Sequence, residues 1–183
     1  MLRTVISIVF VATLACAHGP VAKSQAEAVV EVVSRDILKH AREAPEGTYI
    51  LIVTRTRGFD LREGDAKRAA DSGIPAGLLQ QLAVDHPHRV TIASGSKEFR
   101  PVTPGDIAGI FAEGPRWDRF YERFPNSRGF VEFSGPVFNA SATEAVVYVD
   151  YNCYGDCGWG SVVYLQHRDG EWVKIHEWLR YIS

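Results

Sequence analysis

The chain has 183 residues and a formal net charge of -2 at pH 7, with 46% hydrophobic and 23% charged residues. These values are close to the averages of soluble globular domains, and the length lets one domain bury about 70% of its unfolded surface. The 20 Lys and Arg residues are spread along the chain and form no basic stripe. The composition therefore argues against nucleic acid as a partner.

Residues 1–17 have the pattern of a secretory signal peptide. Arg3 supplies a positive charge near the start, and residues 4–15 form an apolar run of twelve. A helix that spans a bilayer needs about 20 apolar residues, so the run favours a cleaved signal segment over a membrane anchor. We therefore expect an exported protein of the bacterial periplasm or envelope.

Two cleavage sites fit this segment. Ala15-Cys16-Ala17 matches the small-residue A-x-A pattern, and cleavage there leaves residues 18–183. "TLAC" resembles a bacterial lipobox, in which Cys16 is lipidated and becomes the new N-terminus, although Thr13 stands where a lipobox usually has Leu. The sequence leaves both sites open. In the second case, we expect the protein to reach the membrane only through the lipid on Cys16.

The N-terminal half mixes helices with one strand. Ser24 and Glu27 form a capping box ahead of an apolar pattern with helical period, which predicts a helix to about residue 44. The other elements predicted here are a strand at 48–56, an exposed loop in the charged segment 61–73, and helices at 75–87, 103–112 and 115–125.

The C-terminal half is dominated by alternating apolar and polar residues, which is typical of strands. Gly135-Pro136 predicts a bulge or an edge break within the first strand. We therefore predict one α+β domain at 18–183, with N-terminal helices packed on a mainly antiparallel sheet. Its last part is a four-strand meander at 130–139, 145–152, 161–167 and 171–178.

A hairpin centred on the segment "NCYGDCGWG" has a register that the apolar pattern defines. If Cys153 lies opposite Cys157, an apolar pair results at several positions along one face of the two strands. A register slip of one residue would move these apolar side chains to the opposite face of the sheet. The tip is then the three residues 154–156. The predicted pairs are Tyr151 with Trp159, Val147 with Val163, and Ala145 with Leu165.

Cys153 and Cys157 are the only cysteines that remain once Cys16 is removed or lipidated. Exported compartments are oxidising, and opposed strand residues are close enough for a disulfide. A zinc site needs four ligands, usually from two clusters, and redox motifs usually have two residues between the cysteines instead of three. We therefore predict a structural disulfide, and we expect no cofactor.

The next hairpin turn contains Asp169-Gly170, a strong turn signal. A two-residue loop would set Leu165 against Lys174. A three-residue loop, with Gly170 in the left-handed conformation, would set Leu165 against Val173. Because the second choice continues the apolar face, we predict the three-residue loop.

Three segments together resemble a family of uncharacterised exported bacterial proteins and lipoproteins. They are "WDRFYERFPNSRGFVEFSGPVFN", "AVVYVDYNCYGDCGWGSVVYL" and "DGEWVKIHEWLRYIS", which carry a C-x3-C-G-x-G hairpin and a Gly-x-Trp strand ending in Ile-Ser. The resemblance extends from Ala28 onward and is strongest after Trp117. "FSGPVFN" departs from the Arg-Val-Gly stretch that is more usual there. The family implies export but supplies no catalytic residues.

Other candidates for chemistry are isolated. The sequence contains no G-x-S-x-G nucleophile motif. His86 and His88 are a possible metal pair, but a Pro-bearing linker of this kind usually holds solvated loop residues. Glu132 and Asp150 are candidate paired carboxylates, as in glycosidases, although any soluble domain offers such pairs by chance.

We therefore expect a non-catalytic binding or structural domain that contacts an envelope protein or a cell-wall component. The alternative is a small periplasmic hydrolase with a carboxylate or histidine site. The predicted contact residues are Tyr154, Asp156 and Trp159, because the disulfide would hold the hairpin tip in one shape and aromatic residues often anchor interfaces. The competing interpretation is that Trp159 only closes the end of the core.

Overall fold

The computed structural model describes residues 24–40, 45–54, 57–84 and 97–183. The predicted signal segment with Cys16, and the pair His86 and His88, lie outside these residues. Within the described part of the chain, no helix is both long enough and apolar enough to cross a membrane.

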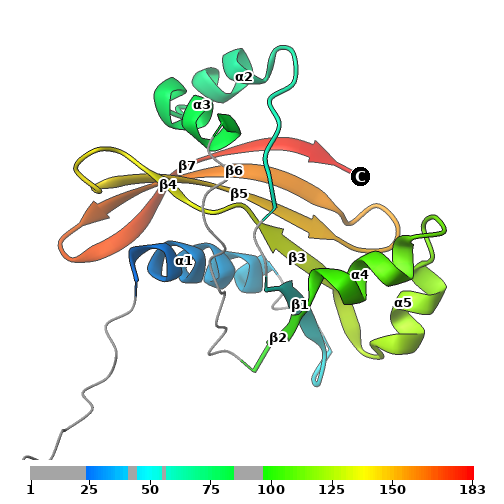
Figure 1. Ribbon diagram of the computed structural model, residues 1–183. Coiled ribbons are helices and arrows are strands. Elements are labelled where there is room, and N and C mark those ends of the chain that lie inside the picture. Colours follow the sequence, from blue (N-terminus) through cyan, green and yellow to red (C-terminus); the bar gives the residue numbers. More distant parts are fainter. Residues whose placement is uncertain (1–23, 41–44, 55–56, 85–96) are drawn as a thin grey trace, which may run out of the picture.

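A mixed sheet forms the centre of the domain and confirms the predicted α+β class (Figure 1). The strand order is β2-β1-β3-β5-β6-β7, and the short β4 also pairs with β5. β1 runs parallel to β2 and β3, and the other pairings are antiparallel. The bounds are β1 Tyr49–Val53, β2 Phe99–Val102, β3 Ser127–Phe133, β4 Val137–Phe138, β5 Glu144–Asn152, β6 Trp159–Arg168 and β7 Glu171–Ile182.

Helices cover both faces of this sheet. α1 lies against one face, and the pair α2 and α3 lies against the other (Figure 1). α4 and α5 pack on β1 and β3, on the side of the sheet opposite α1. The bounds are α1 Gln25–His40, α2 Asp65–Asp71, α3 Ala76–Val84, α4 Pro104–Phe111 and α5 Trp117–Arg123.

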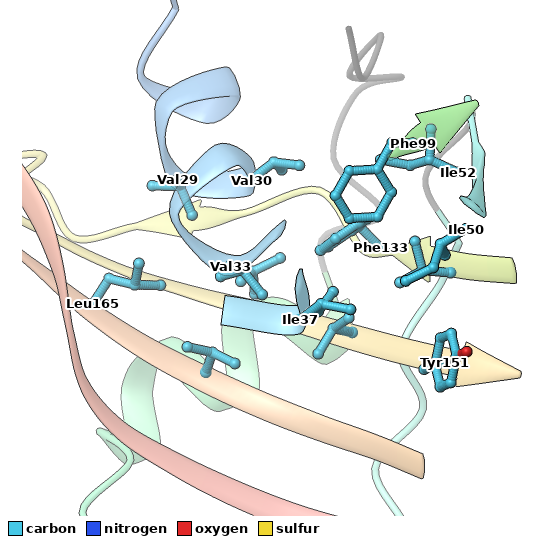
Figure 2. Packing of buried hydrophobic residues seen from close by; sticks show 14 of the residues in the cluster. Val29, Val30, Val33, Ile37, Ile50, Ile52, Phe99, Phe133, Tyr151 and Leu165 are labelled. Carbon is cyan, nitrogen blue, oxygen red and sulfur yellow. The ribbon is translucent and has the colours of Figure 1, made fainter. Parts of the chain in front are cut away.

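The largest core lies between α1 and the sheet, and Figure 2 shows it from close by. Ser24 and Glu27 form the predicted capping box: the backbone N–H of Ser24 donates to the Glu27 carboxylate at 2.9 Å, and the Glu27 N–H donates to the Ser24 hydroxyl at 3.2 Å. Beyond this cap, apolar residues spaced by one helical turn meet the sheet. The buried hydrophobic residues of α1 are Val29, Val30, Val33 and Ile37.

The β5–β6 hairpin has the register that the apolar pattern predicts. Tyr151 lies opposite Trp159, Val147 opposite Val163, and Ala145 opposite Leu165. Because strand side chains alternate, one set of β5 residues faces α1 and the intervening set faces α2 and α3.

The predicted three-residue loop after β6 is wrong. The loop has two residues, Asp169 and Gly170, with φ values of 52° and 87°, as a type I′ turn requires. Leu165 therefore lies opposite Lys174. A register shift between Tyr164 and Leu165 then sets Val162 opposite Trp178 and Val163 opposite Glu177. The prediction failed because it assumed an unbroken ladder with one continuous apolar face.

Segment 61–73 is not an exposed loop, because it contains α2. The helix contacts the protein through the small side chain of Ala69 and the buried carboxylate of Asp65, so it lacks a stripe of large apolar residues. The strand predicted at 130–139 is two strands, β3 and β4, separated near the Gly135-Pro136 break. β2 was not predicted, and β7 extends four residues beyond the predicted end at 178, to Ile182.

At Gly129 the backbone of β3 lies very close to the end of β5, and a substitution there tests this contact. Its φ is +124°, and an added Cβ would overlap the backbone oxygen of Asn152. We predict that Gly129→Ala lowers the free energy of unfolding by about 2 kcal/mol or more, measured by urea unfolding. The control is Gly77→Ala at an exposed position of α3, where a Cβ meets nothing within 4 Å. This variant should be neutral or raise the free energy of unfolding by up to about 1 kcal/mol. Equal stability of the two variants would contradict this.

Candidate functional site

The disulfide between Cys153 and Cys157 closes the β5–β6 hairpin, as predicted. The two Cα atoms are 5.9 Å apart, which is an ordinary separation for a bridged pair. Cys153 is buried with 6% of its surface exposed, whereas Cys157 is exposed. Gly155 at the tip has a φ of 84°, a conformation that glycine adopts readily. The bridge therefore encloses a short tip in one defined shape.

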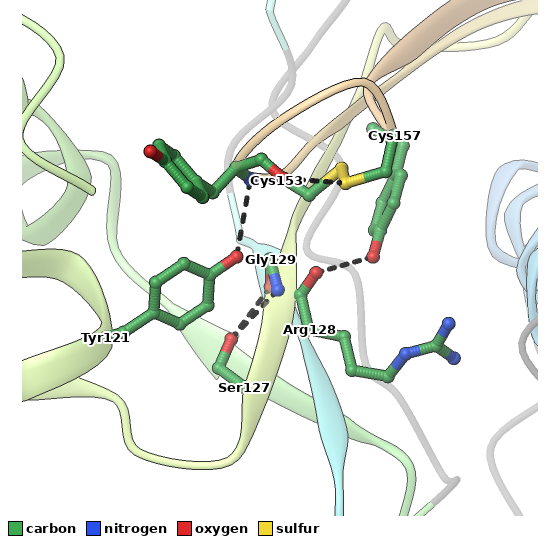
Figure 3. Close-up of a disulfide and its surroundings, with 8 residues drawn as sticks. Tyr121, Ser127, Arg128, Gly129, Cys153 and Cys157 are labelled. Atoms are coloured by element: carbon green, nitrogen blue, oxygen red, sulfur yellow. Dashed lines mark hydrogen bonds between the residues drawn. A yellow bond between two sulfur atoms is a disulfide. The ribbon is translucent and has the colours of Figure 1, made fainter. Parts of the chain in front are cut away.

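Hydrogen bonds attach the hairpin to its neighbours at its tip and at the adjoining end of β5 (Figure 3). The backbone N–H of Tyr154 donates to the Tyr121 hydroxyl of α5 at 3.3 Å. The Tyr151 hydroxyl donates to the Arg128 carbonyl of β3 at 2.6 Å. The tip is thus held by α5 and β3 in addition to the disulfide.

A cavity of about 370 Å³ lies beside the disulfide, on the face of the sheet that α1 covers. Helix α1 contributes one wall, the central strands β5 and β6 form the floor, and the end of β7 forms another wall. The apolar lining residues are Val33, Ile37, Val149, Trp159, Val163, Leu179 and Ile182.

A bulge near the end of β7 shapes the wall of this cavity. Ser161 pairs with Leu179 and Gly160 pairs with Tyr181, so Arg180 is an extra residue in the ladder. An extra residue lets two successive side chains lie on the same side of a sheet. Leu179 and Ile182 line the cavity, with 49% and 68% of their surfaces exposed.

Arg180 and Tyr181 make their contacts on the opposite face. Arg180 forms an ion pair with the buried Asp65 at 2.7 Å, and its Nη2 also donates to the Asp60 carbonyl at 2.6 Å. The Tyr181 hydroxyl donates to Asp150. Burial opposes ionisation of Asp65, but hydrogen bonds from Arg62 and Arg68 and the charge of Arg180 outweigh it and lower the pKa of Asp65. These contacts fix the end of β7 from behind the cavity.

In the part of the chain that the structure describes, three carboxylates line the cavity, those of Asp36, Asp156 and Glu177. Lys174 bonds to Asp36 and, at 3.0 Å, to Glu177. Burial alone would lower the pKa of Lys174, but the two carboxylates raise it, so Lys174 keeps its charge. Asp156 is exposed and makes no hydrogen bond or ion pair with the residues that the structure describes. It is therefore the carboxylate at this cavity that is available to a ligand.

A second polar cluster lies on the face of the sheet opposite the cavity. Glu132 of β3 and Asp150 of β5 lie directly opposite each other. One guanidinium nitrogen of Arg57 contacts both carboxylates, Glu132 at 3.3 Å. Asp150 also accepts the hydroxyl of Tyr181. The structure thus brings the two candidate carboxylates together, which spacing in the sequence does not show.

The charge state of this cluster follows from its burial. Burial raises the pKa of Glu132, the charge of Arg57 opposes the rise, and Asp150 adds to it. Burial and the hydrogen bond to Asp150 raise the pKa of Tyr181. In glycosidases the two carboxyl groups flank a bond of the substrate across an open site. Here a single atom of Arg57 lies between them, so the geometry favours an ionic link that ties Arg57 to the sheet.

The predicted contact residues divide between two surfaces. Tyr154 is 70% exposed at the hairpin tip. Asp156 and Trp159 line the cavity, and Trp159 also packs on Tyr151 with ring centroids 6.1 Å apart. Sequence reasoning missed Leu179 and Ile182, because the last strand was expected to end at Trp178. The sequence signal for this end of the strand is that residues 178–182 remain mostly apolar or aromatic. Simple alternation would not place Leu179 and Ile182 on one face, because that placement depends on the bulge at Arg180.

Known proteins do not add to this picture. No protein-family model, curated protein or solved structure matches the chain. Within the described residues, no group of three or more His, Cys, Asp or Glu side chains could hold a metal ion. The geometry of the cavity is therefore the basis for assigning a function.

The pH dependence of stability tests the surroundings described for Glu132 in the polar cluster. Its folded-state pKa is raised above that of the unfolded chain, so its contribution to stability is complete below the unfolded pKa and is lost as pH rises through the folded pKa. We predict that the stability of the wild type relative to Glu132→Gln decreases between about pH 4 and pH 7. Urea unfolding of both proteins across this pH range measures the difference between their free energies of unfolding.

The matched control for that experiment is Glu171→Gln, a change at an exposed position at the start of β7. This substitution also removes one carboxylate, but from a position outside the polar cluster. A pH dependence found only for Glu132→Gln is therefore assigned to the cluster. A wild-type advantage over Glu132→Gln that grows with rising pH would contradict the environment described for Glu132.

Proposed function

We propose that this protein is a non-catalytic ligand-binding domain of the bacterial envelope, and that it holds the apolar part of a ligand in the cavity between α1 and the end of β7. The observation that carries the proposal is the cavity itself. Its volume of about 370 Å³ falls in the range of small-molecule sites, which are concave, mostly apolar and marked by a few polar groups.

The exposure of the cavity wall supports this function. Leu179 and Ile182 are among the large hydrophobic residues that remain exposed, and both line the cavity. An apolar ligand would remove these side chains from water, at a gain of about 25 cal/mol for each Å² buried. The binding energy thus comes from surface that the folded chain leaves uncovered.

The rigidity of the walls also supports binding. Val33 and Ile37 are held in a helix, Val163 lies in a central strand, and Cys157 is bridged to Cys153. A site that is already formed loses little conformational entropy when the ligand enters.

Export is part of the same proposal. The signal-peptide pattern at 1–17 supports it, as does the disulfide, since such bonds persist in oxidising compartments. The exposed Tyr154 at the hairpin tip remains our proposed contact with an envelope protein or a cell-wall component.

The alternative function, a small periplasmic hydrolase, is favoured by one observation, the opposed pair Glu132 and Asp150. Arg57 and Tyr181 contact both carboxylate oxygens of Asp150, and Arg57 also contacts one oxygen of Glu132. A carboxylate pair that acts as acid and base needs an oxygen on each partner that can reach the substrate. Because both oxygens of Asp150 are engaged, the ligand-binding function accounts better for the geometry.

The mass of the exported protein tests the proposed location. We predict that the mature form lacks residues 1–15 and carries a lipid on Cys16, or lacks residues 1–17. Intact-mass measurement on protein recovered from a bacterial envelope fraction distinguishes the two forms. A product of full length that stays in the cytoplasm would contradict export.

Binding of a neutral hydrophobic dye, Nile red, tests the cavity. We predict that Leu179→Ser weakens binding about fivefold, because a half-exposed leucine contributes roughly 1 kcal/mol of apolar contact. Val173→Ser is the matched control, since Val173 is 40% exposed on the same strand but does not line the cavity. Fluorescence titration of the mature protein gives both affinities. Absence of binding, or equal weakening by the two substitutions, would refute the proposed site.

A further inference from the structure

The charges around the cavity are uneven. Among the residues that the structure describes, the charged ones that line it are all carboxylates, those of Asp36, Asp156 and Glu177. Lys174 contacts the first and the last of these, and Lys39 also lies 3.6 Å from Asp36. With both lysines counted, these five described groups carry a net charge of -1, and among them the carboxylate without a lysine partner is Asp156. The cavity therefore favours a positive group and disfavours an anion.

Asp156 is held in a fixed place relative to the apolar wall. It lies inside the ring closed by Cys153 and Cys157. Trp159 follows three residues later and lines the same cavity. A carboxylate and an indole at one site are both suited to an ammonium group, the first by charge and the second through the face of its ring.

We propose that the ligand is a cationic amphiphile, a free small molecule whose apolar body enters the cavity while its ammonium group pairs with Asp156 at the edge of the site. The proposal rests on the binding function proposed above and specifies its ligand class. The apolar walls provide most of the affinity, and Asp156 selects for charge.

Three probes with the same alkyl chain separate charge from apolar contact: octylammonium, octanol and octanoate. Titration calorimetry on the mature protein with its disulfide intact should give the tightest binding for octylammonium and the weakest for octanoate. The preference for octylammonium over octanol should decrease in high salt, because salt screens an exposed ion pair.

Asp156→Asn is the decisive variant. It should weaken octylammonium binding about two- to fivefold, the range of an exposed ion pair, and leave octanol binding unchanged. Asp169→Asn is the matched control, because Asp169 is an exposed aspartate at the tip of the other hairpin. This control should change neither affinity.

The outcomes distinguish the two proposals. If octanol binds but octylammonium has no advantage, or if Asp156→Asn leaves octylammonium binding unchanged, the cationic ligand class is overturned while the binding cavity stands. Tighter binding of octanoate overturns it as well. If none of the three probes binds, the proposed binding function itself fails.

Discussion

The antiparallel pairing of β5 with β6 is the constraint on which the rest of the structure depends. These strands are central in the sheet and have helices on both faces, so their buried apolar side chains belong to one layer or the other. Val163 faces α1, whereas its neighbour Val162 belongs to the cluster with α2 and α3. A slip of one residue would exchange the two layers. The disulfide closes the hairpin in the same register.

The end of β7 links the two faces of the sheet. Leu179 lies opposite Ser161 and lines the cavity, and the bulge at Arg180 brings Ile182 to the same side. On the opposite face, Arg180 bonds to Asp65 and Tyr181 bonds to Asp150. Removing one partner of such a buried ion pair typically costs 3–5 kcal/mol. The polar contacts on the face opposite α1 therefore hold the end of β7, which forms a wall of the cavity on the α1 face. Charged residues that do not line the cavity thus help to determine its shape.

The features that could be predicted from the sequence are those for which several neighbouring residues indicate the same structure. The β5–β6 register could be predicted because several apolar pairs, including Tyr151 with Trp159, agree on it. The loop at Asp169-Gly170 was mispredicted because a single bulge changes the pairing beyond it. Helix α2 was missed because its buried contacts are Ala69 and the ionic Asp65, neither of which contributes to an apolar period.

The candidate site was predicted only in part, for a similar reason. Asp156 and Trp159 could be singled out because the disulfide and the aromatic residues mark their hairpin in the sequence. Val33 and Leu179 complete the cavity from distant parts of the chain, and a local pattern shows only that such residues are apolar. Which apolar surfaces leave a space between them depends on how α1 and β7 are placed on the sheet.

The central claim is that apolar ligands enter on the α1 face of the sheet, beside the disulfide. Methyl NMR of the mature protein during titration with octanol tests it most directly, because Val162 and Val163 are neighbours that point to opposite faces. The account predicts that the methyl signals of Val33, Val163 and Leu179 shift with one common affinity while those of Val146 and Val162 stay in place. Shifts confined to Val146 and Val162, or no shift at saturating octanol, would contradict it.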